Sequence, residues 1–187
     1  SKTDNCPSCS GGYHYTFERA GEEACVMVAG RRLSPGRTGG YHRDLRGGWG
    51  DPVLAHESQV VAVDDALSDN TGAVIEPLSI AMHAVLQTSP KEHEPVLVIG
   101  SGAIALGVIW SLRATGYQGT LVAQAKRAHE QELALKMGAT EVVTPGPEAR
   151  QALVDTGASA YMPIVGPEVF AGGGFPLIYD CVGNDSS

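Results

Sequence analysis

The feature that most constrains the fold is the stretch VLVIGSGAIALG at residues 96–107, in which three glycines lie within an otherwise apolar run. The first apolar part is short enough for a buried strand, and the second has the length of a helix. A strand that passes through a glycine turn into a helix begins a βαβ unit, and this alternation continues downstream. We therefore predict an α/β fold with a parallel sheet and right-handed crossover helices. The expected strands are 96–99, 120–123, 141–143 and 177–183, and the expected helices are 71–89, 103–114, 128–137 and 148–155.

The residues before this alternation have a different pattern. Residues 1–50 contain several glycine clusters, which indicate loops. Residues 52–63 fit a strand with a polar interruption, and residues 64–70 are polar and typical of a turn. We therefore expect one domain to end near residue 70. Residues 71–187 then supply the first half of a doubly wound Rossmann sheet, without the strands of its second half.

The composition excludes several classes of function. A net charge of −8 and a pI near 5.1 argue against a nucleic-acid surface, which needs clustered positive charge. No run reaches the roughly 18 apolar residues of a membrane span, and the polar N-terminus has no signal-peptide pattern, so we expect no membrane partner. Four cysteines in 187 residues do not make a disulfide framework, which favours a reducing, cytoplasmic location.

The glycine turn fits the pattern G-x-G-x-x-[G/A] of dinucleotide-binding sites. In that pattern the first glycine allows a tight turn, the second lets a pyrophosphate approach the backbone, and a small third residue lets helix and strand pack closely. The amides at the helix N-terminus and the helix dipole then favour an anion. Because glycines also mark ordinary turns, an accidental match is the alternative. The residues expected to contact a cofactor here are Gly100, Ser101, Gly102, Ala103 and Ile104, with Ala105 as the small third residue.

A second requirement of such sites falls at the end of the next strand. Sites for NAD usually place an Asp or Glu there to accept a hydrogen bond from the ribose 2′-hydroxyl. In this chain Gln124 and Ala125 occupy that place, and Lys126 and Arg127 follow. Without the carboxylate a 2′-phosphate is not repelled, and a guanidinium can bind it with two hydrogen bonds. We therefore expect Ala125, Lys126 and Arg127 to contact NADP, with NAD as the alternative and a solvated helix start as the other interpretation of the two basic residues.

Five segments together resemble the medium-chain, zinc-dependent alcohol dehydrogenase family, near its sorbitol and threonine dehydrogenase-like branches. They cover about two thirds of the chain in the family's order. The segments are GGWGDPVLAHESQVVAV at Gly47–Val63, IEPLSIAMHAV at Ile75–Val85, VLVIGSGAIALG at Val96–Gly107, KMGATEVV at Lys136–Val143 and IYDCVG at Ile178–Gly183. The resemblance implies that residues 1–70 end a GroES-like β-rich catalytic domain and that residues 71–187 begin a Rossmann domain. It also implies hydride transfer between a small alcohol or polyol and NADP(H), with zinc as a Lewis acid.

The resemblance assigns roles to three further kinds of residue. Glu76, in the EPL motif, matches the acid that these branches place at or beside the catalytic metal, although a solvated helix-start glutamate is the alternative. Val182, in the IYDCVG segment, is implied to contact the cofactor. His83 could face the same cleft as Glu76, but we expect it to be an interior residue. Cys181 is expected to be a small packed apolar residue.

Cys6 and Cys9 have the two-residue gap of a zinc knuckle, in the region where the family has a structural zinc lobe with four cysteines. The usual pattern would place two more cysteines near Thr3 and Phe17, and neither is Cys. Since structural zinc takes four ligands, we favour a degenerate lobe with free thiols over a complete zinc site.

The family's catalytic Cys and its Gly-His-Glu metal motif have no counterpart in this chain. We therefore expect the chain to be the central portion of an oxidoreductase, inactive alone and homo-oligomeric at full length. A zinc-free relative of the quinone reductases is one alternative. A non-catalytic dinucleotide-binding module is the other.

Overall fold

The structure, a computed structural model, describes residues 27–28, 31–32 and 61–183 of the chain. The chain divides into two compact units, Ser1–Ala66 and Leu67–Ser187. In the first unit, β1 (Met27–Val28) and β2 (Arg31–Arg32) form an antiparallel pair in which Met27 lies opposite Arg32. The GroES-like tail and the zinc lobe expected around Cys6 and Cys9 lie outside the described residues, so both stay predictions.

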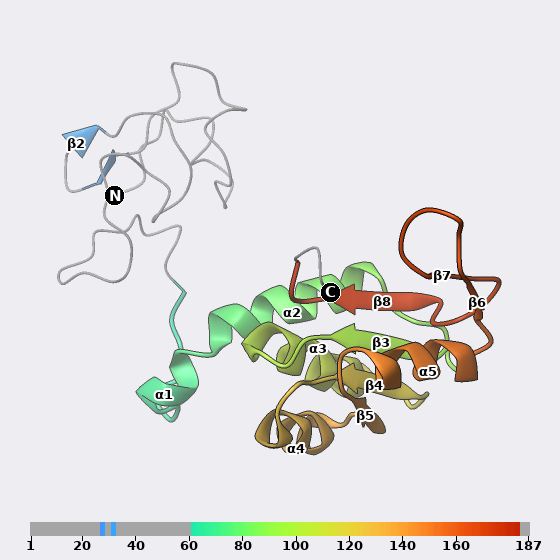
Figure 1. Cartoon of the computed structure of the whole chain (residues 1–187). Helices are drawn as coiled ribbons and strands as arrows, with labels where there is room; N and C mark the ends of the chain where they lie inside the picture. Colours follow the sequence, from blue (N-terminus) through green and yellow to red (C-terminus); the bar gives the residue numbers. More distant parts are fainter. Residues whose placement is uncertain (1–26, 29–30, 33–60, 184–187) are drawn as a thin grey trace. The chain divides into compact units, whose positions relative to one another are not determined.

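The second unit contains the predicted parallel sheet. Its strands are β3 (Val96–Ile99), β4 (Leu121–Gln124), β5 (Glu141–Val143) and β8 (Leu177–Asp180), and every neighbouring pair is parallel. The spatial order is β5-β4-β3-β8, with β8 at one edge and β5 at the other (Figure 1). The chain thus builds outwards from β3 in one direction and then returns to its other side. This is the strand order 3-2-1-4 of a doubly wound sheet, and the α/β prediction is confirmed.

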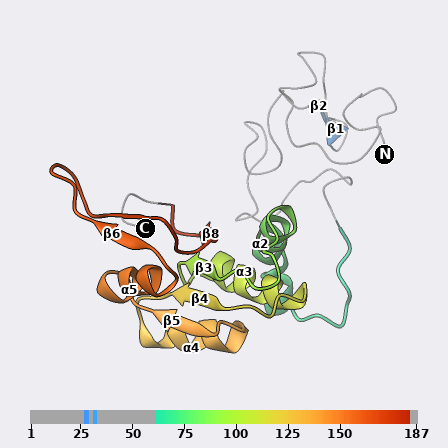
Figure 2. The ribbon, with the colours of Figure 1, turned by 90° about the vertical axis from the view of Figure 1, so that its right-hand side faces the viewer.

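Helices cover both faces of this sheet. On one face, α2 (Ile75–Gln87), α3 (Ala103–Ala114) and α4 (Ala128–Met137) share a core with Val96 and Val98 of β3. On the other face, α5 (Pro147–Asp155) packs through Ala152 and Leu153 on a second cluster around Leu97, Val122 and Phe175. Figure 2 shows the helices around the strands from the side. Because β3 and β4 are covered on both faces, they consist almost entirely of apolar residues.

Two contacts hold α2 against this core. An added Cβ on Gly107 of α3 would lie 2.9 Å from the Cβ of Ala81, so the glycine lets the two helices approach closely. The Tyr179 hydroxyl of β8 donates a hydrogen bond to the Thr88 carbonyl just after α2 (2.6 Å). The hydrogen bond thus ties the end of α2 to strand β8 of the sheet.

The element boundaries agree closely with the predicted ones. The predicted ranges 96–99, 103–114, 128–137 and 141–143 match the observed elements, whereas β4 begins and ends one residue later than expected. The helix predicted at 71–89 is α2, which begins at Ile75 and carries Pro77 in its first turn, where the missing amide costs no helical hydrogen bond. A short helix, α1 (Asp69–Gly72), was not predicted. It is capped by the Ser68 side chain and begins within the segment 64–70 that was predicted as a turn.

A hairpin was missed. β6 (Ser159–Tyr161) and β7 (Val169–Ala171) form an antiparallel pair between the helix predicted at 148–155 and the strand predicted at 177–183, where no element was expected. The hairpin extends beyond the sheet in both views (Figures 1 and 2). Its strands have three residues each and are mostly exposed, so they lack the apolar alternation that identifies a strand in a sequence. Among the described residues, no helix is long and apolar enough to cross a membrane.

Candidate dinucleotide-binding site

Gly100 directly follows β3 and turns the chain towards α3. Its φ of 113° lies in the left-handed region that favours glycine. Its amide donates to the Gln124 carbonyl at the end of β4 (3.1 Å), and an added Cβ would lie 3.0 Å from Cγ2 of Val182. A side chain at this position would be strained and would also crowd the end of β8. The glycine turn is therefore fixed between the carboxyl ends of three strands.

Gly102 differs from Gly100 because no other described residue fills the space beside it. It is the N-cap of α3 with φ −78° and ψ −176°, and apart from its chain neighbours no atom of the described residues lies within 4 Å of an added Cβ. No side chain caps this helix, and its first turn holds no acidic residue. The amides of the first turn have no partner within the helix, so they can donate to an anion that approaches the exposed Gly102 and Ala103. A dinucleotide pyrophosphate fits this arrangement.

Ala105 lies under the same turn. It is fully buried, and its Cβ would be 3.7 Å from a Cβ added to Gly100. A larger residue in its place would push the start of α3 away from β3. The small third residue of the pattern therefore has the packing role expected of it.

The end of β4 lies beside the turn and carries no acid. Gln124 is half-buried, Ala125 is buried, and Lys126 and Arg127 are exposed. The Ala125 amide pairs with the Val143 carbonyl of β5 (2.9 Å), which continues the ladder past the strand ends. Two basic side chains therefore follow directly after the strand that adjoins the glycine turn.

A carboxylate that sequence reasoning missed lies within this region. Oε2 of Glu130, on α4, accepts a hydrogen bond from the Arg127 amide (3.1 Å). Oε1 of the same carboxylate forms an ion pair with Nη1 of Arg127 (3.0 Å). The Ser101 side chain of the glycine turn lies near the same carboxylate. The Arg127 amide, and then Ser101, hold the pKa of Glu130 below its ordinary value. The sequence carries no standard capping-box signal for it, because an arginine and not a serine or threonine stands at the N-cap, three residues before Glu130.

The carboxyl end of β8 completes the site. Asp180 Oδ1 accepts from the amides of Val182 (2.9 Å) and Gly183 (3.0 Å), which fixes the turn after the strand. Val182 remains half-exposed above Gly100. Cys181 packs on the core as expected, and burial raises the pKa of its thiol. Since β3 and β8 are the strands between which the chain reverses direction, their carboxyl ends form the crevice where such sheets bind ligands.

Two residues considered for the metal site, Glu76 and His83, lie on α2. Glu76 is exposed in the first turn of α2, and His83 on the same helix is also exposed, so the expectation of an interior histidine is wrong. Within residues 61–183 and the two short strands, no three His, Cys, Asp or Glu side chains gather into a metal-binding group. The described residues do not hold a zinc ion by themselves, and the role of Glu76 stays a prediction.

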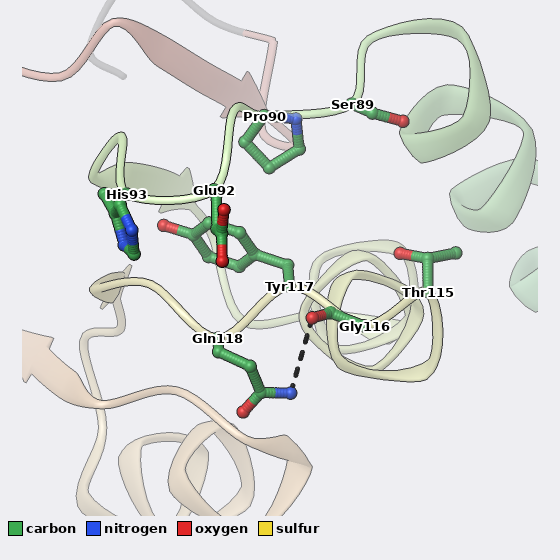
Figure 3. A pocket seen from close by; sticks show the side chains of 8 residues that line it. All are labelled: Ser89, Pro90, Glu92, His93, Thr115, Gly116, Tyr117 and Gln118. Carbon is green, nitrogen blue, oxygen red and sulfur yellow. Dashed lines mark hydrogen bonds between the residues drawn. The ribbon is translucent and has the colours of Figure 1, made fainter.

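A separate cavity lies at the opposite end of the strands, near the amino ends of β3 and β4. It has a volume of about 480 Å³ and is lined by Ser89, Pro90, Glu92, His93, Thr115, Gly116, Tyr117 and Gln118. Figure 3 shows the Tyr117 ring among these side chains, with Nε2 of Gln118 donating to the Gly116 carbonyl. Because β3 and β4 are parallel, their carboxyl ends, where the glycine turn lies, are at the other end of the sheet, and this cavity is not part of the glycine-turn site.

Comparison with known proteins gives the family. No family model matches the chain. It is 32% identical over 137 residues to a candidate diacetyl reductase [(R)-acetoin forming] 2 of Saccharomyces cerevisiae, covering 73% of this chain and 30% of that protein. It is 30% identical over 142 residues to the L-threonine 3-dehydrogenase of Rhizobium johnstonii, covering 73% of this chain and 41% of that protein.

A solved structure agrees with these relatives. A candidate zinc-binding dehydrogenase from Sinorhizobium meliloti 1021, bound to NADP, superposes with a TM-score of 0.52 at 31% identity, covering 58% of this chain and 31% of that one. The chain thus spans between three and four tenths of the length of these relatives. The chain is a partial-length relative of the zinc-binding medium-chain dehydrogenases, the family of the sorbitol, threonine and butanediol dehydrogenases.

Proposed function

We propose that this chain forms the NADP-binding part of an oxidoreductase that transfers a hydride between a small alcohol or polyol and NADP(H). The observation that carries the proposal is the open backbone at Gly102, at the uncapped start of α3, beside a β4 end that has no acid and is followed by Arg127. The names of the relatives, and the NADP bound to the Sinorhizobium meliloti protein, support the same cofactor and substrate class.

Each part of the site has a separate task in this proposal. The amides of Gly102 and Ala103 donate to the pyrophosphate, which is favoured there by the positive end of α3. Arg127 binds the 2′-phosphate of the adenosine ribose through its guanidinium. Val182 borders the crevice between β3 and β8, through which the rest of the dinucleotide extends. When bound, NADP(H) supplies the carbon that accepts or donates the hydride.

The proposal for zinc rests on the family resemblance alone. Glu76 is proposed to lie at or beside the catalytic metal, and Cys6 and Cys9 to belong to a structural lobe. Because the described residues contain no complete ligand set, no reaction step is assigned to the metal. Metal analysis of the full-length protein with and without Glu76→Gln tests this: about one zinc per chain that falls with the substitution supports the role, and unchanged zinc contradicts it.

The cofactor proposal is tested by titrating the full chain with NADPH and NADH, following the fluorescence of the nucleotide. Arg127→Ala should weaken NADPH binding by about ten-fold or more, since a charge-assisted contact is lost, and should change NADH binding less than about two-fold. Arg150→Ala is the matched control, because Arg150 is an exposed arginine of α5 in an ion pair with Glu168 (3.8 Å). Equal losses for both nucleotides, or no binding of either by the unsubstituted chain, would overturn the proposal.

A further inference from the structure

Glu130 links the two loops of the candidate site. Ser101 lies in the glycine turn after β3, and Arg127 lies in the turn after β4, yet both act on the same carboxylate of α4. Arg127 forms an ion pair with it, and Ser101 helps to lower its pKa. The Glu130 side chain is only 17% exposed, whereas the Arg127 side chain is 70% exposed. A partly buried negative charge is therefore held beside the guanidinium that faces solvent.

The two oxygens of this carboxylate have different partners. Oε2 accepts from the Arg127 amide, which is the hydrogen bond that caps α4, whereas Oε1 pairs with the guanidinium. The next helix provides a comparison. Oε2 of Glu148 accepts from both the amide (2.7 Å) and the hydroxyl (2.6 Å) of Thr144 before α5. Thr144 lies two residues before the N-cap of α5 and carries no charge, so a first-turn glutamate can bond to the preceding turn without an arginine partner. The ion pair of Glu130 is therefore an addition to its bond with the Arg127 amide.

We propose that Glu130 is a specificity-determining residue that competes with the 2′-phosphate of NADP for Arg127 and so keeps the site able to accept NADH. The inference deepens the proposed function and rests on it. A 2′-phosphate binds Arg127 only if the guanidinium turns from Glu130 or shares its five N–H donors between the two anions. In either case the carboxylate repels the doubly charged phosphate. NADH carries a hydroxyl in this place and meets no such repulsion.

The position of Glu130 also explains how a site without an acid at the end of β4 could still bind a ribose. The absent carboxylate is the usual partner of the ribose hydroxyls. Here a carboxylate comes from the first turn of the following helix and is oriented by the Arg127 amide. An acid supplied from α4 therefore opposes the basic residue supplied by the end of β4. The balance between the two sets the preference for one nucleotide over the other.

The test is the ratio of NADPH to NADH affinity in Glu130→Gln. Glutamine retains an oxygen that can accept the capping hydrogen bond from the Arg127 amide but removes the charge. The substitution should tighten NADPH binding about five-fold and leave NADH binding within about two-fold. Adenosine 2′-phosphate, titrated alone, should gain by a similar factor, which places the effect at the 2′-phosphate. Glu148→Gln changes a first-turn glutamate that bonds to the turn before α5, and this control should leave both affinities unchanged.

Glu130→Ala keeps the test decisive if the glutamine variant is poorly folded, because the ratio of two affinities cancels a loss that both nucleotides share. A purely capping role predicts equal losses for NADPH and NADH in both variants, with an unchanged ratio. That result, or a ratio that moves towards NADH, would overturn the inference while leaving the NADP proposal intact. If the unsubstituted chain binds neither nucleotide, the proposed function fails and the inference fails with it.

Discussion

Substitution of Gly102 by alanine separates ligand binding from folding, because the glycine has no structural neighbour at its Cα. The backbone has φ −78° and ψ −176°, which any residue adopts, and within residues 61–183 only its chain neighbours lie within 4 Å of the new methyl group. Alanine gains roughly 0.4–1 kcal/mol by restricting the unfolded chain. It loses a similar amount because it is a poorer N-cap than glycine. We therefore expect the free energy of unfolding to change by less than about 0.5 kcal/mol.

The same methyl group occupies the space through which a phosphate would reach the amides of α3. A hydrogen bond to a charged group is worth about 1.5–3 kcal/mol, so losing one such contact should weaken NADPH binding roughly 10- to 150-fold. At a nucleotide concentration 100 times the original dissociation constant, bound NADPH stabilises the protein by about 2.7 kcal/mol. After a 100-fold loss of affinity, the same concentration contributes only about 0.4 kcal/mol.

The assay is thermal and urea unfolding with and without NADPH. The expected result is that Gly102→Ala unfolds like the unsubstituted chain without nucleotide but loses most of the stabilisation that NADPH provides. Gly72→Ala is the control, since Gly72 ends α1 with equally empty space around its Cα. NADPH affinity within two-fold of the original in Gly102→Ala would show that no phosphate approaches this backbone. The proposed site would then be wrong.

Three further predictions concern the scaffold. Ser111→Ala should raise the free energy of unfolding by about 1 kcal/mol, because the buried Oγ has no hydrogen-bond partner among the described residues; urea unfolding measures it. Arg113→Ala should cost about 2–4 kcal/mol in the same assay, since Nε and Nη1 donate to three carbonyls, those of Gly138 (2.8 Å), Tyr117 (2.7 Å) and Gly119 (3.1 Å). Burial raises the pKa of Tyr117, so the unfolded chain loses this proton first and stability should fall as the pH rises above the ordinary tyrosine pKa of 10.0. Tyr117→Phe should flatten that fall in urea midpoints measured between about pH 9 and 11.

The sequence predicted the sheet and its helices because the second unit repeats one simple pattern. Each strand is an apolar run closed by a turn, and most of the helices begin or end at glycine or proline. Gly102 is the N-cap of α3, Gly138 ends α4, and Gly146 with Pro147 begins α5. Such signals are local, so they can be read without knowledge of the fold. The glycine turn was predictable for the same reason, since its pattern lies within a few residues of one strand end.

The features that were missed depend on contacts between segments or on very short elements. Ser101 and Glu130 are 29 positions apart, and only the packing of α4 beside the glycine turn brings their side chains together. The exposure of His83 is different, because it follows from the helical period: His83 lies about 200° around α2 from Ala81, opposite the face that Ala81 and Val85 bury. The β6–β7 hairpin has three residues in each strand, too few for an alternating pattern to show.

The three glycines of residues 96–107 have three different physical reasons to be glycine, and the contrast identifies which of them a ligand explains. Gly100 adopts a φ of 113° and lies against Val182, so the fold itself requires it. Gly107 faces Ala81 at 2.9 Å from an added Cβ, so helix packing requires it. Gly102 meets neither demand, because its backbone angles suit any residue and no other residue in the described part of the chain lies within 4 Å of an added Cβ. Substitution of Gly100 or Gly107 should therefore lower stability as well as binding, whereas substitution of Gly102 should lower binding alone. If all three variants lost stability together, Gly102 would be part of the scaffold, and the space beside it would no longer point to a phosphate.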